Sequence, residues 1–249
     1  MKCIILAGGY AKRLWPITLT QSKALLRVGH KPVIEYIIDN IDKTNVNEII
    51  ISTNQKFEKD FSQWIDKNSG KFKKPIRLFV EPTTAEENKF GAVKGISYIM
   101  DEMKIEEDCM VIAGDNLFDF DLNNFLKFFH EKRGFVVAVY NVESKDKAKL
   151  YGVINVDDKE RVTQFIEKPS VPASTLISTA CYVFPKETFY LVSEFLKQEN
   201  MADALGQFLQ WVHKRIPVYA YSFDGYWFDI GDKEVLKKAE EWVRKVGVE

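Results

Sequence analysis

Short apolar runs alternate with longer segments of helical periodicity through the first half of the chain. The runs are rich in Ile and Val and contain no Gly or Pro, as is typical of strands buried on both faces. They predict strands at Lys2–Leu6, Glu48–Ser52, Ile76–Val80, Cys109–Ala113 and Phe135–Tyr140. The segments between carry apolar residues three and four positions apart and predict helices at Pro32–Asp42, Lys56–Asp66, Gly91–Met103 and Asp121–Lys132. This alternation indicates βα units around a mainly parallel sheet.

The second half has a different pattern, in which strands follow one another with few helices between them. Strands are predicted at Gly152–Val156, Val162–Ile166 and Leu176–Phe184, and their succession favours antiparallel ribbons added to the sheet. Further elements are predicted at Lys186–Lys197, Ala202–Lys214, Val218–Ser222, Tyr226–Asp229 and Lys233–Val246, the first two and the last being helices. Without a repeat or a linker, the pattern predicts one α/β domain with a substrate-binding insertion in its second half.

Composition narrows the classes of partner. The 249 residues are 46% hydrophobic and 29% charged, and 35 Lys and Arg against 36 Asp and Glu give a formal net charge of −1. No bulk field therefore attracts the chain to nucleic acid or to an anionic membrane, and a small molecule is the expected partner. Three isolated cysteines and the lack of an apolar run of about 18 residues favour a cytoplasmic location.

Two glycines and several cations follow the first predicted strand, in the run LAGGYAKRLWPITLTQSKALL. Ligands of open parallel sheets bind at the carboxyl ends of strands, and this run begins at such an end. Gly8 and Gly9 allow backbone N–H groups to approach an anion closely, and Arg13 and Lys23 are suited to neutralise two phosphate groups. From these residues alone, a phosphate-binding loop and a glycine turn flanked by solvated cations are equally good interpretations.

The longer run LAGGYAKRLWPITLTQSKALLRVGHKPVIEY resembles the signature of nucleotide-sugar pyrophosphorylases, which are sugar-1-phosphate nucleotidyltransferases. That signature is Gly-Gly-x-Gly-x-Arg-Leu-x-Pro with a later Lys and a Lys-Pro pair, and the spacing fits without a gap. Ala11 departs from it, because the family commonly has glycine there. The resemblance implies that the nucleotide is bound by Leu6, Ala7, Gly8, Gly9, Arg13 and Lys23.

Two aspartates follow later apolar strands. Asp115 lies in MVIAGDNLFDFDL and Asp229 in GYWFDIGDK, 114 positions further on. A carboxylate at a strand end beside phosphates is suited to Mg²⁺. The alternative for Asp115 is a turn acid that caps the helix region Asp121–Lys132, and for Asp229 a strand-end acid without a ligand is the favoured interpretation from the sequence alone. Both segments resemble the family's metal-binding segments, and the resemblance implies that Asp115 and Asp229 hold one Mg²⁺.

The segments YGVINVD, QFIEKPS and STACYVF resemble the sugar side of the family. The resemblance implies backbone contacts from Gly152, hydroxyl binding by Glu167, a phosphate contact from Lys168 and a sugar-facing Thr179. Without it, Glu167 and Lys168 form an ordinary solvated strand end, and a strand threonine such as Thr179 is usually structural.

The stretch FVEPTTAEENKFGAVKGI lies where the family recognises the base and implies Glu81 and Gly91 as nucleotide-binding residues. Uracil and thymine offer one ring N–H between two carbonyls, which an amide matches. Guanine offers two adjacent donors, which a carboxylate accepts side by side. Glu81 therefore leaves GTP open, while backbone groups from Leu6 to Gly8 serve uracil or thymine, so the base stays undecided.

The resemblance covers residues 1 to about 233 and implies a Rossmann-like three-layer α/β/α fold with a β-rich sugar-binding insertion. Within a single catalytic domain, residues 1–140 would bind the nucleotide, residues 141–232 the sugar phosphate, and residues 233–249 would form a C-terminal helix.

The implied reaction transfers a nucleoside monophosphate from an NTP to a sugar 1-phosphate, with dTTP or UTP and glucose 1-phosphate favoured. Its catalytic residues would be Arg13, Lys23, Asp115 and Asp229. The alternatives are a GTP-dependent mannose-1-phosphate guanylyltransferase, a cytidylyltransferase for another phosphate acceptor, and a non-catalytic nucleotide-sugar-binding regulatory subunit. The expected partners are NTP and the sugar 1-phosphate, without nucleic acid or membrane, and a homo-oligomer is left open.

Overall fold

The computed structural model describes residues 1–84, 87, 89–198 and 202–247. Its contacts group the chain into two compact units. Unit 1 consists of residues Met1–Lys89, Ile112–Leu122 and Gly225–Glu249, and unit 2 of Phe90–Val111 and Asn123–Asp224. Unit 1 therefore gathers three separate stretches of the sequence, including both ends of the chain.

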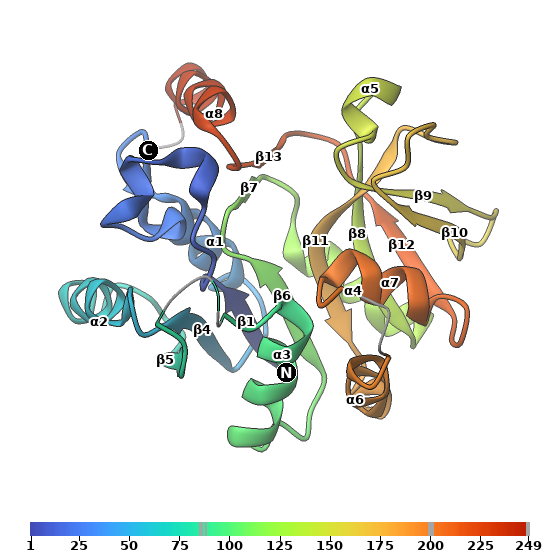
Figure 1. The fold of residues 1–249 in the computed structure, drawn as a ribbon, viewed down its shortest axis with the longest axis horizontal. Helices are drawn as coiled ribbons and strands as arrows, with labels where there is room; N and C mark the ends of the chain where they lie inside the picture. Colours follow the sequence, from blue (N-terminus) through green and yellow to red (C-terminus); the bar gives the residue numbers. More distant parts are fainter. Residues whose placement is uncertain (85–86, 88, 199–201, 248–249) are drawn as a thin grey trace. The chain divides into compact units, whose positions relative to one another are not determined.

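Unit 1 is built on parallel strands. Strand β1 (Lys2–Leu6) pairs with β4 (Glu48–Asn54), and β4 pairs with β5 (Ile76–Glu81), both in parallel register. Residues Cys3 to Ile5 and Ile49 to Ile51 have no exposed surface, which explains why these strands read as unbroken apolar runs. Helices α1 (Val33–Ile41) and α2 (Glu58–Lys67) follow β1 and β4 (Figure 1).

Shorter elements complete unit 1. Three 3₁₀ turns, η1 (Lys12–Leu14), η2 (Ile17–Leu19) and η3 (Lys23–Leu25), lead from β1 to a small hairpin of β2 (Arg27–Val28) and β3 (Lys31–Pro32). Strand β7 (Asn116–Phe118) pairs antiparallel with β13 (Trp227–Asp229), which precedes α8 (Lys233–Val246). The side chain of Asp232 caps α8 by accepting hydrogen bonds from the N–H groups of Glu234 and Val235.

Unit 2 combines antiparallel and parallel pairs. Strand β11 (Leu176–Phe184) pairs antiparallel with β8 (Phe135–Asn141) and with β9 (Gly152–Val156), and β9 pairs antiparallel with β10 (Val162–Glu167). Strand β12 (Val218–Ser222) pairs parallel with β8. Helices α3 (Ala92–Glu102), α6 (Tyr190–Leu196) and α7 (Leu205–Val212) belong to this unit, as does the short α5 (Lys145–Ala148). Strand β6 (Cys109–Ala113) and helix α4 (Leu122–Lys132) cross the unit boundaries.

The predicted fold class is confirmed, because the chain is a mixed α/β protein with a central, mostly parallel sheet. The predicted strands and the antiparallel ribbons after Tyr140 are present, with ends that differ by at most two residues. One predicted helix is wrong in part: Lys186–Lys197 begins with the 3₁₀ turn η5 (Lys186–Thr188) and continues as α6. The division into nucleotide, sugar and C-terminal parts stays a prediction.

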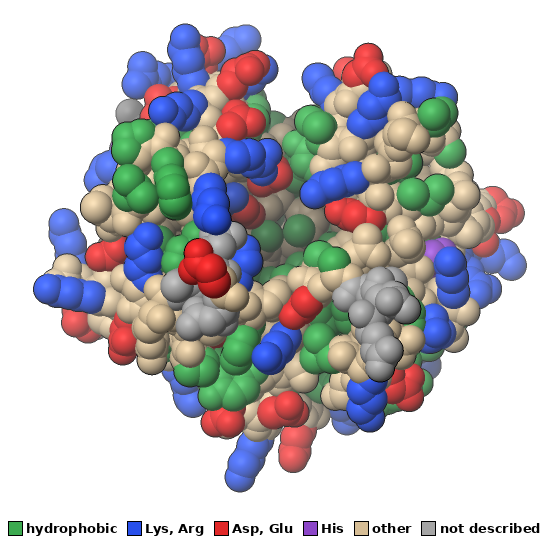
Figure 2. All heavy atoms as spheres, in the orientation of Figure 1, with side chains coloured by type: hydrophobic (Ala, Val, Ile, Leu, Met, Phe, Trp, Pro, Cys, Tyr) green, Lys and Arg blue, Asp and Glu red, His purple; other side chains and the backbone are tan. Residues whose placement is uncertain are grey.

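Charges of both signs are mixed on one face of the surface. On the face drawn in Figure 2, Lys and Arg side chains are interspersed with Asp and Glu side chains. None of the described helices is long and apolar enough to cross a membrane.

Candidate active site

Two carboxylates from distant parts of the sequence meet in unit 1. The antiparallel pairing of β7 with β13 sets Asp229 opposite Asn116, the neighbour of Asp115. The N–H of Ile230 donates to the carbonyl oxygen of Asp115 at 2.9 Å. The three-residue strands therefore hold the backbones of Asp115 and Asp229 together, as the sequence prediction required.

Asp115 and Asp229 are close enough for the charge of one carboxylate to affect the pKa of the other. Burial raises the pKa of the Asp229 carboxyl to about 6, and the negative charge of Asp115 adds to the rise, while Lys23 and Arg13 oppose it. Lys23 forms an ion pair with Asp115, and the two side chains are 16% and 25% exposed. The structure thus brings all four predicted catalytic residues into one electrostatic cluster.

Arg13 reaches the cluster because a glycine leaves space for it. Its Nη2 atom lies 3.0 Å from the position that a Cβ on Gly231 would take, so any larger residue at 231 would press on the guanidinium. Ala11, two residues before Arg13, has φ 47° and ψ 50°, the left-handed conformation that favours glycine. Position 11 therefore has a left-handed backbone and not an ordinary right-handed one, although alanine stands where the family commonly has glycine.

Sequence reasoning missed two residues that orient Asp115. The amide of Asn116 donates from Nδ2 to Oδ1 of Asp115 at 2.9 Å, and its Oδ1 accepts from the indole Nε1 of Trp227 at 2.5 Å. Asn116 is only 3% exposed. Both residues stand in the motifs quoted above, but only the pairing of β7 with β13 reveals this hydrogen-bonded chain.

The predicted nucleotide-binding backbone lies next to a buried acid. The carbonyl oxygen of Gly8 accepts from Nδ2 of Asn54 at 2.7 Å, which fixes the loop after β1. Glu81 is 7% exposed, and its Oε1 accepts from the Ser52 hydroxyl at 2.9 Å. Both carboxylate oxygens of Glu81 lie 3.7 Å from the position of a Cβ on Gly8. Residues Leu6 to Gly9 and Glu81 therefore lie together in unit 1.

A second cluster, in unit 2, surrounds Glu167 at the end of β10. Burial raises the pKa of the Glu167 carboxyl, and the charge of Lys168 partly offsets the rise. The Lys168 ammonium lies 3.8 Å from Oε1 of Glu167 and is 65% exposed. The backbone N–H of Glu167 donates to Oε1 of Gln210 on α7 at 3.0 Å.

One glycine makes the space that the Glu167 carboxylate occupies, and a second glycine lies beside that carboxylate. A Cβ on Gly206 would overlap the carboxylate itself, whereas a Cβ on Gly152 would overlap the Phe165 ring and would lie 3.0 Å from Oε2 of Glu167. Gly152 was predicted as a sugar-binding residue, whereas nothing in the sequence singled out Gly206 or Gln210. Their position beside Glu167 follows from the packing of α7 against β10.

Two predicted site residues have structural partners within unit 2. Thr179 is 1% exposed, and its hydroxyl donates to the carbonyl oxygen of Ala138 at 2.9 Å, so the structure places it in the interior rather than among groups open to a sugar. Gly91 precedes α3, and a Cβ there would overlap Asp203. The Asp203 carboxylate accepts from the N–H of Val93 at 2.8 Å. Residues 85, 86 and 88, in the segment expected to contact the base, lie outside the described residues.

The donor set of the unit 1 cluster fits a hard divalent cation. Such ions take one or two carboxylates together with phosphate oxygens and water, and Asp115 and Asp229 supply two carboxylates. Within residues 1–84, 87, 89–198 and 202–247 there is no group of three or more His, Cys, Asp or Glu residues able to hold a metal ion. A cation at this cluster would therefore need further oxygen ligands from a substrate or from water.

Comparison with known proteins assigns the chain that carries these two clusters to a family. The model of the family described as nucleotidyl transferase matches residues 2–245. The chain belongs to the nucleotidyl transferase family. This match spans both clusters, from the glycine pair after β1 to the acid of β13, so the family resemblance expected from the motifs is confirmed.

Three members or neighbours of the nucleotidyl transferase family illustrate its range. A "putative mannose-1-phosphate guanyltransferase" of Sulfolobus acidocaldarius is 30% identical over 93% of this chain and 60% of its own length. The UTP–glucose-1-phosphate uridylyltransferase AglF of Haloferax volcanii is 27% identical over 97% of this chain and 96% of its own. A crystal structure of a "putative glucose-1-phosphate thymidylyltransferase" from Bacillus anthracis has a TM-score of 0.84 and 25% identity, covering 98% and 95% of the two chains.

Three of the curated relatives that this chain matches are longer than the chain. It spans 54 to 60% of their length. The comparisons show the family of this chain, but they do not show its activity or its substrates.

Proposed function

We propose that this chain transfers a nucleoside monophosphate from an NTP to a sugar 1-phosphate and releases pyrophosphate. The observation that carries the proposal is the unit 1 cluster, in which two cations and two carboxylates meet although they come from three distant parts of the sequence. An NTP presents several negative charges that cations can neutralise, and its complex with a divalent ion needs acidic ligands. The family of the chain supports this chemistry.

The reaction is a displacement at the α-phosphate. An oxygen of the sugar phosphate forms a bond to the α-phosphorus, and the bond from that phosphorus to the bridging α,β-oxygen breaks, so that pyrophosphate leaves. Because the attacking oxygen is already an anion near pH 7, the site needs no general base. Its tasks are alignment and charge neutralisation.

The residues of unit 1 divide these tasks. Arg13 is exposed and stabilises the charge that develops on the leaving pyrophosphate. Lys23 holds the triphosphate, and it leaves its ion pair with Asp115 to do so. Asp115 and Asp229 would hold Mg²⁺, which when bound supplies positive charge at the α-phosphate oxygens. Asn116 keeps the Asp115 carboxylate oriented.

The residues of unit 2 bind the acceptor. Glu167 accepts hydrogen bonds from sugar hydroxyls through its carboxylate, which lies against Gly206. Lys168, with its ammonium largely exposed, contacts the phosphate of the sugar phosphate. Thr179 has no part in this proposal.

For the base and the sugar, we propose dTTP or UTP with glucose 1-phosphate. Relatives named for uridylyl and thymidylyl transfer to glucose 1-phosphate support this choice. A second candidate is GTP with mannose 1-phosphate, and a specific observation favours it. The buried Glu81 carboxylate lies beside Gly8, where its oxygens suit the two adjacent donors of guanine. The three cysteines are buried, and within the described residues none of them forms a disulfide, which supports our proposal of a reducing, cytoplasmic location.

Pyrophosphate release with Mg²⁺ tests the proposal across dTTP, UTP, GTP and CTP, each with glucose, N-acetylglucosamine and mannose 1-phosphates and with phosphocholine. We expect release with dTTP or UTP and a hexose 1-phosphate. Release with GTP alone would replace the favoured base by the second candidate. If no pair of substrates gives pyrophosphate release, the result would contradict the catalytic proposal and favour a binding subunit.

Glu81→Gln sharpens the choice of base in the same assay. If Glu81 accepts from guanine, the variant loses turnover with GTP and keeps turnover with UTP. If the base is uracil or thymine, an amide at this position, which both donates and accepts, leaves UTP turnover equal or higher.

A further inference from the structure

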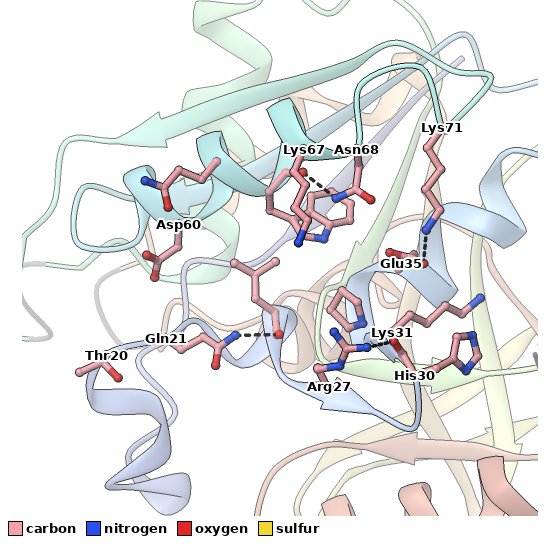
Figure 3. A pocket seen from close by; sticks show the side chains of 14 residues that line it. Thr20, Gln21, Arg27, His30, Lys31, Glu35, Asp60, Lys67, Asn68 and Lys71 are labelled. Atoms are coloured by element: carbon pink, nitrogen blue, oxygen red, sulfur yellow. Dashed lines mark hydrogen bonds and ion pairs between the residues drawn. The ribbon is translucent and has the colours of Figure 1, made fainter.

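Unit 1 contains a pocket that includes none of the four charged residues of the proposed active site. It has a volume of about 660 Å³ (Figure 3). Its lining consists of seven residues between positions 20 and 32, Glu35 of α1, one side of α2 with Asn68 after it, and Lys71; the seven are Thr20, Gln21, Leu25, Arg27, His30, Lys31 and Pro32. This volume lies within the range of small-molecule sites, which is roughly 300 to 1,000 Å³.

The charges that line the pocket do not cancel one another. Glu35, 7% exposed, is neutralised by Lys71 at 2.5 Å, and Lys31 pairs with Asp39 outside the pocket. Arg27 and Lys67 also line the pocket. Neither forms an ion pair with any residue in the described part of the chain, and the Arg27 guanidinium donates to the neutral carbonyl of His30.

These two cations lie on different walls. Figure 3 shows the Lys67 side chain extending from α2 toward the segment that carries Arg27. Asp60 lies at the other end of the pocket, toward Thr20 and Gln21. An anionic group between Arg27 and Lys67 would satisfy both cations, because charge-assisted hydrogen bonds are stronger than neutral ones.

The rest of the lining suits an organic body attached to that anion. Trp64 of α2 and Leu25 of η3 line the pocket and offer apolar surface. The Asp60 carboxylate is an acceptor for hydroxyl groups. A phosphate with an attached ring that carries hydroxyls matches this combination of two cations, an indole and a carboxylate.

The pocket also touches the turn that carries Lys23. Gln21 and Leu25 line the pocket, and Nε2 of Gln21 donates to the carbonyl oxygen of Leu25 at 2.9 Å. Between them, Lys23 points out of the same 3₁₀ turn, η3, to its ion pair with Asp115. A molecule that fixes Gln21 and Leu25 therefore also fixes the backbone that presents Lys23.

We propose that this pocket is a second ligand site, for a small organic phosphate held between Arg27 and Lys67, and that its occupation orders the turn carrying Lys23. The site is separate from the proposed reaction, and its test needs no turnover.

Calorimetric titration with adenosine 5′-monophosphate, glucose 6-phosphate and inorganic phosphate, without a divalent metal, measures binding. We compare the wild type with Arg27→Gln/Lys67→Gln and with Lys43→Gln/Lys59→Gln, a control that removes two exposed lysines of unit 1 outside the pocket lining. Arg13→Ala reports binding at the proposed active site instead. All four exchanged side chains of the two double variants are exposed, and melting curves check that each variant is folded.

We expect an organic phosphate to bind the wild type, the lysine control and Arg13→Ala with equal affinity. Its affinity for the Arg27→Gln/Lys67→Gln variant should be lower by about tenfold or more. Binding that survives in that variant, that is lost in Arg13→Ala, or that is absent for both organic probes would overturn the site. Inorganic phosphate binding as tightly as the organic probes would overturn the ligand class.

Hydrogen exchange tests the link to Lys23. The organic phosphate that binds should slow amide exchange across residues 20–26 in the wild type and leave it unchanged in Arg27→Gln/Lys67→Gln. Unchanged exchange in the wild type with ligand bound would overturn the ordering of the turn.

Discussion

The two clusters of this nucleotidyl transferase are built by opposite means. In unit 1, charge determines the arrangement: Asp115 and Asp229 repel each other, and Lys23 and Arg13 partly compensate them. In unit 2, shape determines the arrangement, because Gly206 leaves the space in which the Glu167 carboxylate lies. The first arrangement is suited to substrates that bring phosphate charge, and the second to a neutral body with hydroxyl groups.

The two arrangements reduce the stability of the folded state in different ways. Holding two acids together disfavours the folded state until a cation compensates their charge. A glycine beside Glu167 instead gives up helix propensity, which for Gly against Ala amounts to about 1 kcal/mol. Substitutions should therefore affect charge-dependent properties in unit 1 and acceptor binding in unit 2.

The largest effect is expected from Asp115→Asn and Asp229→Asn in unit 1. Each variant removes one of the two carboxylates proposed to hold the divalent ion, and turnover should fall by about a thousandfold. Steady-state pyrophosphate release measures this. Asp101→Asn, at an exposed position on α3, is the control and should match the wild type; a comparable loss there would point to a general effect of charge.

A smaller effect is expected from Gly206→Ala in unit 2. The new Cβ would overlap the Glu167 carboxylate, so the KM for the sugar phosphate should rise about tenfold while the KM for NTP stays unchanged. Glu167→Gln should raise the same KM, and adding Gly206→Ala to it should change little, since the two substitutions act on one contact. Independent, additive effects would contradict the proposal that Gly206 leaves space for the Glu167 carboxylate.

The pH dependence of stability distinguishes the two arrangements further. The Asp229 carboxyl has its pKa raised from 3.8 to about 6, so between these values the folded state binds more protons than the unfolded state. Without a divalent ion, this group lowers the free energy of unfolding as pH rises from about 4 to about 6, by about 1 kcal/mol or more. Urea unfolding at several pH values should show this fall in the wild type and a smaller fall in Asp229→Asn. Identical pH profiles would contradict the pKa and its cause.

The smallest effect concerns the loop that carries Arg13. Ala11 adopts a left-handed conformation, which costs an alanine roughly 1 kcal/mol, while glycine costs a similar amount through the freedom of the unfolded chain. Ala11→Gly should therefore change the free energy of unfolding by less than about 1 kcal/mol. Ala239→Gly, within α8 and buried, should cost more than this. A large loss in Ala11→Gly would show that the methyl group makes a contact of its own.

Much of the fold could be predicted from periodicity, because its strands are long apolar runs. Strands β1, β6, β9, β11 and β12 have the predicted bounds. Strand β7 was missed, since three residues are too few to show a period, and so were the two-residue strands β2 and β3. These short elements depend on partners that are distant or that follow a turn, and no local pattern reveals them.

Only those residues of the candidate site that lie in recognisable sequence motifs could be predicted. Arg13, Lys23, Asp115 and Asp229 stand in recognisable segments, and the structure brings them together. Gly206 lies in no such segment, because its role exists only once α7 packs against β10. Thr179 illustrates the converse: its motif suggested a sugar contact, whereas its hydroxyl serves the backbone of the neighbouring strand.

The most direct test of the central claim follows the phosphates of the NTP. The chain is supplied with Mg²⁺, a sugar 1-phosphate and an NTP that carries a label on either the α- or the γ-phosphate. The account predicts that the α-label appears in the nucleotide sugar and the γ-label in pyrophosphate. Release of the γ-label as orthophosphate, or a nucleotide-sugar fraction without the α-label, would contradict it.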